Sequence, residues 1–318
     1  MYSVLLPALQ CPIAPAIHPL VALAENHTDK WLRRFNLLRE HEYEIYRRQG
    51  FAYMVARMFP TARTDILFAI TDINTLLFLL DDQIDHQQDL NTGIGEKNNL
   101  KHFVGNFLTV LTEHRSWENQ HHPALAALAE FWERMCNITS IDWQHRFVAS
   151  IQDTFNAALW QLNNISNHRI PPIEEYVRYR NYLGAANIAT DTIYAVTGLQ
   201  EDWGKLNTVI DGLTLQCRNI VCWANDLYSL SKEIEQKDIY NLVSLIQYHG
   251  QVDQEEAISR AMNKHNNDMD IFIKESELLL KKNHSNDLFT YVTSLMHIIR
   301  GNVDWSEKET TRYKFSYK

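Results

Sequence analysis

Long stretches without helix-breaking residues limit the folds open to this chain more than any other feature. Its 318 residues include 10 glycines and 8 prolines, and half of the prolines stand within residues 1–20. Glycine and proline are the strongest breakers of regular structure. No run alternates apolar and polar residues over a strand length, and the sequence has no internal repeat. We therefore expect an all-α protein that forms one domain of about ten helices.

Caps and breakers set the expected helix boundaries. Thr28 or Asp29 is expected to cap the first helix, and Gly50 is expected to end it. Gly184 and Ala185 fall inside a later helix, where a kink or a loosened turn is plausible. The helices are expected at about 28–49, 64–85, 98–115, 122–137, 140–166, from 172 onward, 202–235, 253–281 and 284–301.

Three segments lie outside these helices in the single domain 1–318. The arm 1–27 is apolar, but it has no basic start and its prolines break any signal-peptide helix. Residues 86–97 are polar with two glycines and are expected to form a loop. The tail 302–318 is charged and aromatic.

Composition excludes several classes of protein. The formal net charge of −9 argues against a nucleic-acid partner, because phosphate contacts need a basic face. No stretch is long and apolar enough to span a membrane. The cysteines show no CxxC pair, so that free, reduced thiols are expected in a soluble, cytoplasmic protein. They are Cys11, Cys136, Cys217 and Cys222.

The first motif with chemical meaning is DDQID at 81–85. Asp81, Asp82 and Asp85 crowd one end of one helix face, where like charges and the helix dipole are both unfavourable. They directly follow the apolar run LLFLL, at the end of a helix that should be central. A site for a hard cation such as Mg²⁺ would explain the cluster, and a solvated helix end is the alternative.

The second motif is NDLYSLSKE at 225–233. Asn225, Ser229 and Glu233 lie at i, i+4 and i+8, so that an amide, a hydroxyl and a carboxylate form one stripe of oxygen donors. Lys232 stands beside them as a donor to a phosphate. The alternative is an exposed helix face, but the apolar residues before the motif suggest a helix that emerges from a core.

Together, the two motifs resemble those of the bacterial class I terpene synthases (terpene cyclases). DDQID matches the family's DDxxD motif, and NDLYSLSKE matches its N-D-x-x-S-x-x-x-E motif, including the lysine before the final glutamate. The resemblance covers nearly the whole chain. It implies a helical-bundle enzyme that ionises a linear prenyl diphosphate, cyclises the carbocation to a terpene hydrocarbon or alcohol, and releases diphosphate.

The resemblance also implies the ligands and the substrate. Three Mg²⁺ ions would be held between the two motif helices, and which of the three aspartates ligates directly stays open. Farnesyl diphosphate is the favoured substrate, with geranylgeranyl diphosphate close behind. The implied metal ligands are Asp81, Asp82, Asp85, Asn225, Ser229 and Glu233.

Further matches concern the diphosphate. Arg180 stands where the family has its diphosphate sensor, with Arg178 as a competitor, and Gly184 matches the effector position at the helix break. Arg312 and Tyr313 match the family's C-terminal Arg-Tyr pair, which makes 302–318 a lid segment. The expected diphosphate ligands are Arg180, Lys232, Arg312 and Tyr313.

A carbocation needs a dry cavity lined by aromatic faces. Phe78 lies one turn before Asp81, so that its ring is expected in the cavity below the metals. Trp305, Phe59, Phe155 and Trp160 are further candidates, in this order, against the alternative of ordinary core packing.

Two other functions are alternatives to this one. A chain-elongating prenyl diphosphate synthase shares the fold but carries two aspartate-rich motifs, and this chain has one. A non-catalytic helical interaction protein would leave the acidic patches merely solvated. The resemblance is compatible with a monomer or a homodimer.

Overall fold

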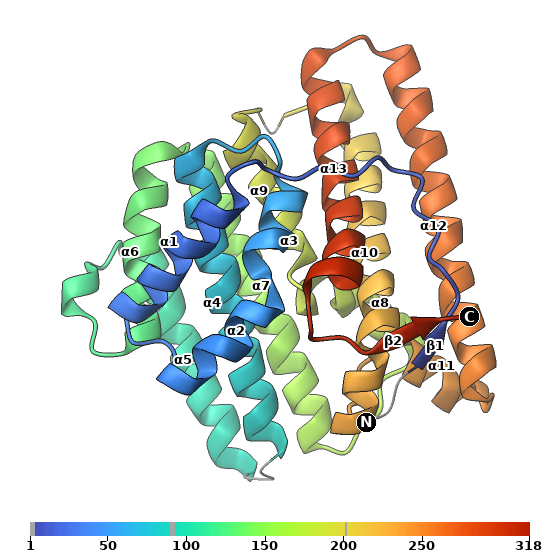
Figure 1. Ribbon diagram of the computed structural model, residues 1–318, viewed down its shortest axis with the longest axis horizontal. Helices are drawn as coiled ribbons and strands as arrows, with labels where there is room; N and C mark the ends of the chain where they lie inside the picture. Colours follow the sequence, from blue (N-terminus) through green and yellow to red (C-terminus); the bar gives the residue numbers. More distant parts are fainter. Residues whose placement is uncertain (1–3, 90–92, 201) are drawn as a thin grey trace.

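The computed structural model describes residues 4–89, 93–200 and 202–318, and the side chains of these residues other than 83–99. Long helices pack side by side, and two short strands lie at one edge (Figure 1). The strands are β1 (Val4–Leu6) and β2 (Phe315–Tyr317). The helices are α1 (Val21–Arg34), α2 (Tyr43–Gln49), α3 (Phe51–Met58), α4 (Thr64–Asp89), α5 (Gly93–Thr112), α6 (Pro123–Ile138), α7 (Ile141–Ser166), α8 (Ile173–Leu183), α9 (Ala186–Thr197), α10 (Asn207–Gln236), α11 (Leu242–Gly250), α12 (Gln254–Lys282) and α13 (Asn286–Asp304).

Helices α4 and α10 carry the two motifs near their carboxyl-terminal ends, and each packs among several neighbours. α4 contacts α1, α3 and α6, while α10 contacts α8, α9, α11, α12 and α13. On α4, Leu67, Ile70 and Leu76 are buried in the larger apolar core. Apolar residues at helical spacing bury such a face and stabilise the helix by packing. The expectation that the helix before DDQID is central is therefore confirmed.

Helices α3 and α13 cross unusually closely at Gly301. A Cβ atom there would lie 2.7 Å from the Met58 backbone nitrogen and 2.8 Å from the Arg57 carbonyl carbon. Because glycine lacks this atom, the two backbones can touch. Arg57 also donates to the buried Asp304 carboxylate at 3.0 Å, which ties the end of α13 to α3.

The start of the first helix was predicted wrongly. α1 begins at Val21, and Thr28 and Asp29 lie inside it rather than at its cap. The Thr28 hydroxyl donates instead to Asp72 at 2.6 Å, and Asp29 accepts from Arg33 at 3.3 Å. These side chains are used in contacts with other turns and helices, which local sequence does not reveal.

Other boundaries differ as well. The predicted helix 28–49 is divided between α1 and α2, and the left-handed Gly50 (φ 64°) ends α2 as predicted. The short helices α3 and α11 were not predicted. The predicted loop 86–97 is helical at 86–89 and 93–97, while 90–92 lie outside the described residues.

The strand pair was also not predicted. β1 and β2 are parallel, with Val4 opposite Phe315 and Leu6 opposite Tyr317. In Figure 1, the segment between β1 and α1 runs along α12 and then over α13. Hydrogen bonds of Gln10 to Asp270 on α12 (2.7 Å), and of Arg300 on α13 to the Cys11 carbonyl (3.3 Å), fix that course.

Two further findings concern membrane-spanning helices and the cysteines. No helix in the described part of the chain combines the length and apolar character needed to cross a bilayer. The cysteines are free thiols, two of them buried. The expectation of no disulfide framework therefore agrees with the structure.

Candidate active site

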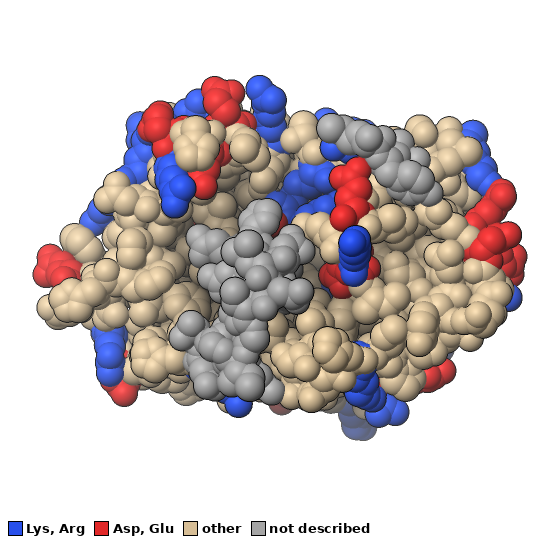
Figure 2. All heavy atoms as spheres, turned by 90° about the horizontal axis from the view of Figure 1, so that it is seen from below, with Lys and Arg blue, Asp and Glu red and all other residues tan. Residues whose placement is uncertain are grey.

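A cavity of about 280 Å³ opens between the ends of α4 and α10. This volume is close to the lower end of ordinary small-molecule sites. Its body is formed by α3, α4, α7, α9 and α13, and its apolar lining includes Met54, Met58, Ile70, Leu77, Ala158, Ile188 and Val221. In Figure 2, basic and acidic side chains gather in a hollow of the face on which these two helices end.

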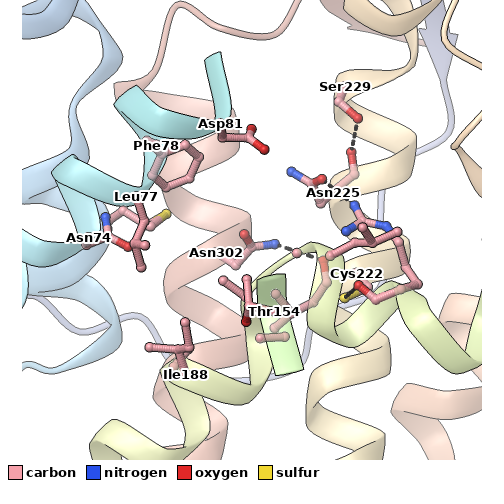
Figure 3. Close-up of a pocket in the computed structure, with 18 of the residues that line it drawn as sticks. Asn74, Leu77, Phe78, Asp81, Thr154, Ile188, Cys222, Asn225, Ser229 and Asn302 are labelled. Carbon is pink, nitrogen blue, oxygen red and sulfur yellow. Dashed lines mark hydrogen bonds between the residues drawn. The ribbon is translucent and has the colours of Figure 1, made fainter. Parts of the chain in front are cut away.

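The aspartates of the first motif differ in orientation and in hydrogen-bond partners. Asp81 lines the cavity, and Figure 3 shows its carboxylate pointing across toward Asn225 and Ser229. Although Asp81 keeps exposed surface, the protein around its carboxylate displaces part of the water and raises its pKa, and the charges of Lys232 and Arg312 oppose that rise. Asp82 instead accepts two hydrogen bonds from Arg312. The side chain of Asp85 lies outside the described residues.

The second motif forms the expected stripe on α10. The Ser229 hydroxyl donates to Glu233 Oε1 at 2.7 Å, and Asn225 lies one turn before it. The other Glu233 oxygen accepts from Asn241 at 2.5 Å. Burial, together with the Asp226 and Asp238 carboxylates, raises the pKa of Glu233 to about 8. A cation at this stripe would relieve the repulsion between these carboxylates.

Arg180 is fixed at the wall of the cavity. It is buried, and its guanidinium donates to Asp226 Oδ1 and to Asn225 Oδ1, both at 2.7 Å. Tyr176 donates to the other Asp226 oxygen at 2.9 Å. Arg178, its competitor in the sequence, is exposed. The geometry therefore favours Arg180 as the arginine that can face a ligand in the cavity.

The predicted helix break lies between α8 and α9. Gly184 ends α8 in ordinary backbone geometry, and the left-handed residue is its neighbour Ala185 (φ 51°). Gly184 is needed for another reason: a Cβ there would lie 2.5 Å from the Arg180 guanidinium. The absence of a side chain at this position lets Arg180 pack against the break.

The segment predicted to be a lid places Arg312 and Tyr313 at the mouth of the cavity. Arg312 donates from both terminal nitrogens to Asp82, at 2.8 and 2.7 Å, with the arginine side chain 7% exposed. Lys232 lies 3.6 Å from the same carboxylate. The Tyr313 hydroxyl accepts from Asn225 at 2.8 Å. The lid thus joins both motif helices, as a bidentate charged pair with defined geometry can.

Aromatic rings line the cavity near the lid. Phe78 and Trp305 lie with their centroids 5.9 Å apart, and both face the cavity. Phe59 and Phe155 also line it. Phe51, which the sequence did not single out, stacks on Phe78 at 4.4 Å. The Arg312 guanidinium lies 5.2 Å above the Phe78 ring, within cation–π range.

Trp160 does not line the cavity, and the prediction that it would is wrong. Its ring stacks on Tyr179 at 4.3 Å, and its N–H donates to Glu175 at 2.8 Å. Trp160 follows Phe155 by five positions, which places the two side chains about 140° apart around α7. Trp160 therefore lies on a different face of α7 from Phe155, Ala158 and Gln161, which line the cavity.

The sequence interpretation missed several amides in the lining, among them Asn74 and Asn302. The amide nitrogen of Asn74 is buried without a hydrogen-bond partner among the described residues. The Asn302 amide donates weakly to the Val221 carbonyl, at 3.4 Å. Asn74 could have been found by extending the stripe Asp81, Phe78 and Leu77 back by one more turn.

The donor set suits a hard cation. Asp81 on one side, and Asn225, Ser229 and Glu233 on the other, offer only oxygen ligands, which Mg²⁺ prefers. Among the described side chains, no three His, Cys, Asp or Glu residues form a metal cluster. The reason is that the α10 stripe combines one carboxylate with an amide and a hydroxyl.

Comparison with solved structures identifies the fold. The linalool/nerolidol synthase of Streptomyces clavuligerus superposes with a TM-score of 0.80 at 21% sequence identity, covering 94% of this chain and 100% of that one. The fold is therefore that of the class I terpene synthases, and the predicted fold class is confirmed.

Sequence comparison identifies the family. The family described as "Terpene synthase family 2, C-terminal metal binding" matches residues 72–270, and the chain belongs to it. The germacrene A synthase of Nostoc punctiforme is 26% identical over 98% of this chain and 96% of its own length. The (+)-T-muurolol synthase of Roseiflexus castenholzii is 29% identical, over 96% and 93%. The chain is thus a terpene synthase with a divalent-metal site, as the two motifs predicted.

Proposed function

We propose that this chain ionises farnesyl diphosphate in the presence of Mg²⁺ and cyclises the resulting cation to a sesquiterpene hydrocarbon or alcohol. The observation that carries the proposal is the division of one cavity into a charged mouth and an apolar, aromatic body. The mouth suits a diphosphate and the body suits a hydrocarbon chain. The Roseiflexus relative bears the description "(2E,6E)-farnesyl diphosphate cyclizing", which favours a C15 substrate.

In this proposal the mouth binds the diphosphate. Arg180, Lys232 and Arg312 bring three positive charges to it, and Tyr313 adds a hydroxyl. Asp81, Asn225, Ser229 and Glu233 would hold Mg²⁺, with three ions expected from the family resemblance. When bound, Mg²⁺ would neutralise the charge of the leaving diphosphate.

The body of the cavity then controls the cation. Phe78 and Trp305 present ring faces just below the mouth, where an allylic cation would form. The closed lid excludes water, which would otherwise end the reaction early. Gly184 and Ala185 bring the helix break into the lining of the same cavity, as expected of an effector position.

The test is incubation of the purified protein with Mg²⁺ and geranyl, farnesyl or geranylgeranyl diphosphate, one at a time. Extracts are read by gas chromatography with mass spectrometry, and released diphosphate is counted separately. A cyclic C15 product from farnesyl diphosphate is expected. A cyclic C20 product would assign the longer substrate. Longer diphosphates formed only after isopentenyl diphosphate is added would identify chain elongation instead.

Variants separate the cavity from the core. Phe78→Leu is expected to change the product mixture, because it removes a ring face from the cavity. Trp160→Phe serves as the matched control, since this ring packs on Tyr179 outside the cavity. Equal effects of the two substitutions on the products would contradict the assigned role of Phe78.

A further inference from the structure

Two short strands connect segments from opposite ends of the sequence. Val4 and Leu6 of β1 are buried, at 3% and 0% exposure, whereas Leu5 between them is 48% exposed. The Leu6 carbonyl accepts a hydrogen bond from the Lys318 N–H at 3.0 Å. The two inward side chains thus insert into the protein body, while the backbone of β1 pairs with β2.

The body holds β1 firmly. Val4 and Leu6 belong to the second apolar core, together with Tyr228 and Leu230 of α10. The bonds from Gln10 and to the Cys11 carbonyl fix the following segment on α12 and α13. β1 therefore offers β2 a fixed edge with which to pair.

The segment β2 begins two residues after Tyr313 of the lid. Its Phe315 ring packs on Tyr228 at 4.8 Å, and Tyr317 and Tyr228 both donate to Glu307. On the other side of Tyr313, Glu309, which follows the end of α13, pairs with Arg57 of α3. Residues 310–314, including Arg312 and Tyr313, thus run between two anchors. Within this segment, the Thr311 N–H donates to the Arg48 carbonyl and the Arg312 guanidinium to the Gln49 side chain, each at 3.0 Å.

One of these anchors depends on β1. A three-residue strand does not hold its shape in water without a partner and apolar burial. Of β2, Phe315 is half-buried, while Ser316 and Tyr317 are exposed. Pairing with β1 therefore adds backbone order to the side-chain contacts of Phe315 and Tyr317.

We propose that Leu6 and Val4 are positioning residues for the terpene synthase reaction. This assignment rests on the proposed function. The two residues hold β2 in register with β1, which keeps Arg312 paired with Asp82 and Tyr313 hydrogen-bonded to Asn225. Loss of this support shifts the lid toward its open state. Diphosphate then binds more weakly, and water enters the cavity.

Water entry has a recognisable product. A water oxygen forms a C–O bond with the allylic cation, and the surplus proton passes to solvent, which leaves an acyclic prenyl alcohol. The ratio of acyclic alcohol to cyclic product therefore reports on lid closure. A purely structural role of β1 would lower stability without changing that ratio.

The test compares Leu6→Ser with Leu5→Ser in the full chain. Leu6→Ser is expected to raise KM for the prenyl diphosphate roughly tenfold and to raise the share of acyclic alcohol. Leu5→Ser, which changes an exposed side chain of the same strand, is expected to leave both near wild type. Leu6→Ile keeps a buried apolar side chain at this position and should therefore show the wild-type KM and product ratio. Equal KM values and product ratios in the two serine variants would overturn the proposal.

Hydrogen exchange of the backbone amides keeps the test independent of turnover. In Leu6→Ser, the amides of 311–317 are expected to exchange at least tenfold faster, while those of α4 and α10 stay protected. Unchanged exchange over 311–317 would overturn the proposal even if no prenyl diphosphate were converted. Val4→Thr replaces Leu6→Ser if the latter fails to fold, with the same expectations.

Discussion

Replacing Asp82 by Asn tests how the two adjacent aspartates divide their roles. Arg312 reaches both oxygens of Asp82, at 2.8 and 2.7 Å, and the two side chains are only 7% and 23% exposed. Among the described residues Asp81 has no such bidentate partner, and it points into the cavity (Figure 3). We therefore expect Asp82 to act as a lid contact and Asp81 as the metal ligand of the proposed function.

The magnitude follows from the geometry. A hydrogen bond to a charged group contributes about 1.5–3 kcal/mol, and Asp82→Asn keeps one acceptor oxygen while losing the charge. A net loss of about 2 kcal/mol is expected, which corresponds to roughly a 30-fold fall in kcat/KM. Asp81→Asn removes a charged cation ligand and is expected to cost about a thousandfold.

The assay measures kcat/KM over a range of Mg²⁺ concentrations. Asp82→Asn should leave the half-saturating Mg²⁺ concentration within about twofold of wild type, and Asp81→Asn should raise it more than about tenfold. The effect of Asp82→Asn should disappear in an Arg312→Gln background, because the partner is already lost. If Asp82→Asn shifts the Mg²⁺ dependence as strongly as Asp81→Asn, Asp82 is a metal ligand and the lid-contact interpretation fails.

Three further substitutions probe other parts of the structure. Gly184→Ala should lower kcat/KM about 100-fold, because the added methyl group displaces Arg180. Gly212→Ala, where an added Cβ meets no atom within 4 Å, should keep activity. Equal kcat/KM values for the two variants would contradict the close approach of Arg180 to Gly184. Asn74→Leu should raise the free energy of urea unfolding by about 1–2 kcal/mol, since it removes a buried amide nitrogen without a partner, and a loss of stability would contradict this. The hydrogen bond from Arg169 lowers the pKa of Glu175 to about 2. The contribution of this pair to folding stability is therefore present above pH 4.5 and is lost as the pH falls toward 2. Glu175→Gln should therefore lower the free energy of unfolding by about 1 kcal/mol at pH 7. The difference in stability between the variant and wild type should shrink below pH 4.5. A difference that does not change with pH would contradict the pairing of Glu175 with Arg169.

The central helices and both motifs could be predicted because their signals are local. A helix places i, i+4 and i+8 on one stripe, so Asn225, Ser229 and Glu233 had to lie together wherever the helix packed. The long apolar run before Asp81 covers nearly all sides of its helix, so that the helix had to be buried. These elements need little information from distant parts of the chain.

The features that were missed depend on distant partners. Three residues carry too little pattern to identify β1 or β2, and each strand exists only because the other lies beside it. Thr28 is a good helix cap by type, but the buried Asp72 on α4 takes its hydroxyl. Phe155 was assigned to the cavity correctly and Trp160 wrongly, because the face of α7 that meets the cavity is set by packing against other helices.

The close crossing at Gly301 bears on how this cavity can change during evolution. Met58 on α3, and Asn302 and Trp305 at the end of α13, line the cavity, and the crossing joins these helices backbone to backbone. This wall can move only as one unit, since any side chain at Gly301 would force the helices apart. Single substitutions that alter the products without loss of folding should therefore accumulate on the wall formed by α7 and α9, at positions such as Thr154 and Ile188. In engineering, that wall offers the positions to vary first, with the α3–α13 pair kept as a fixed frame.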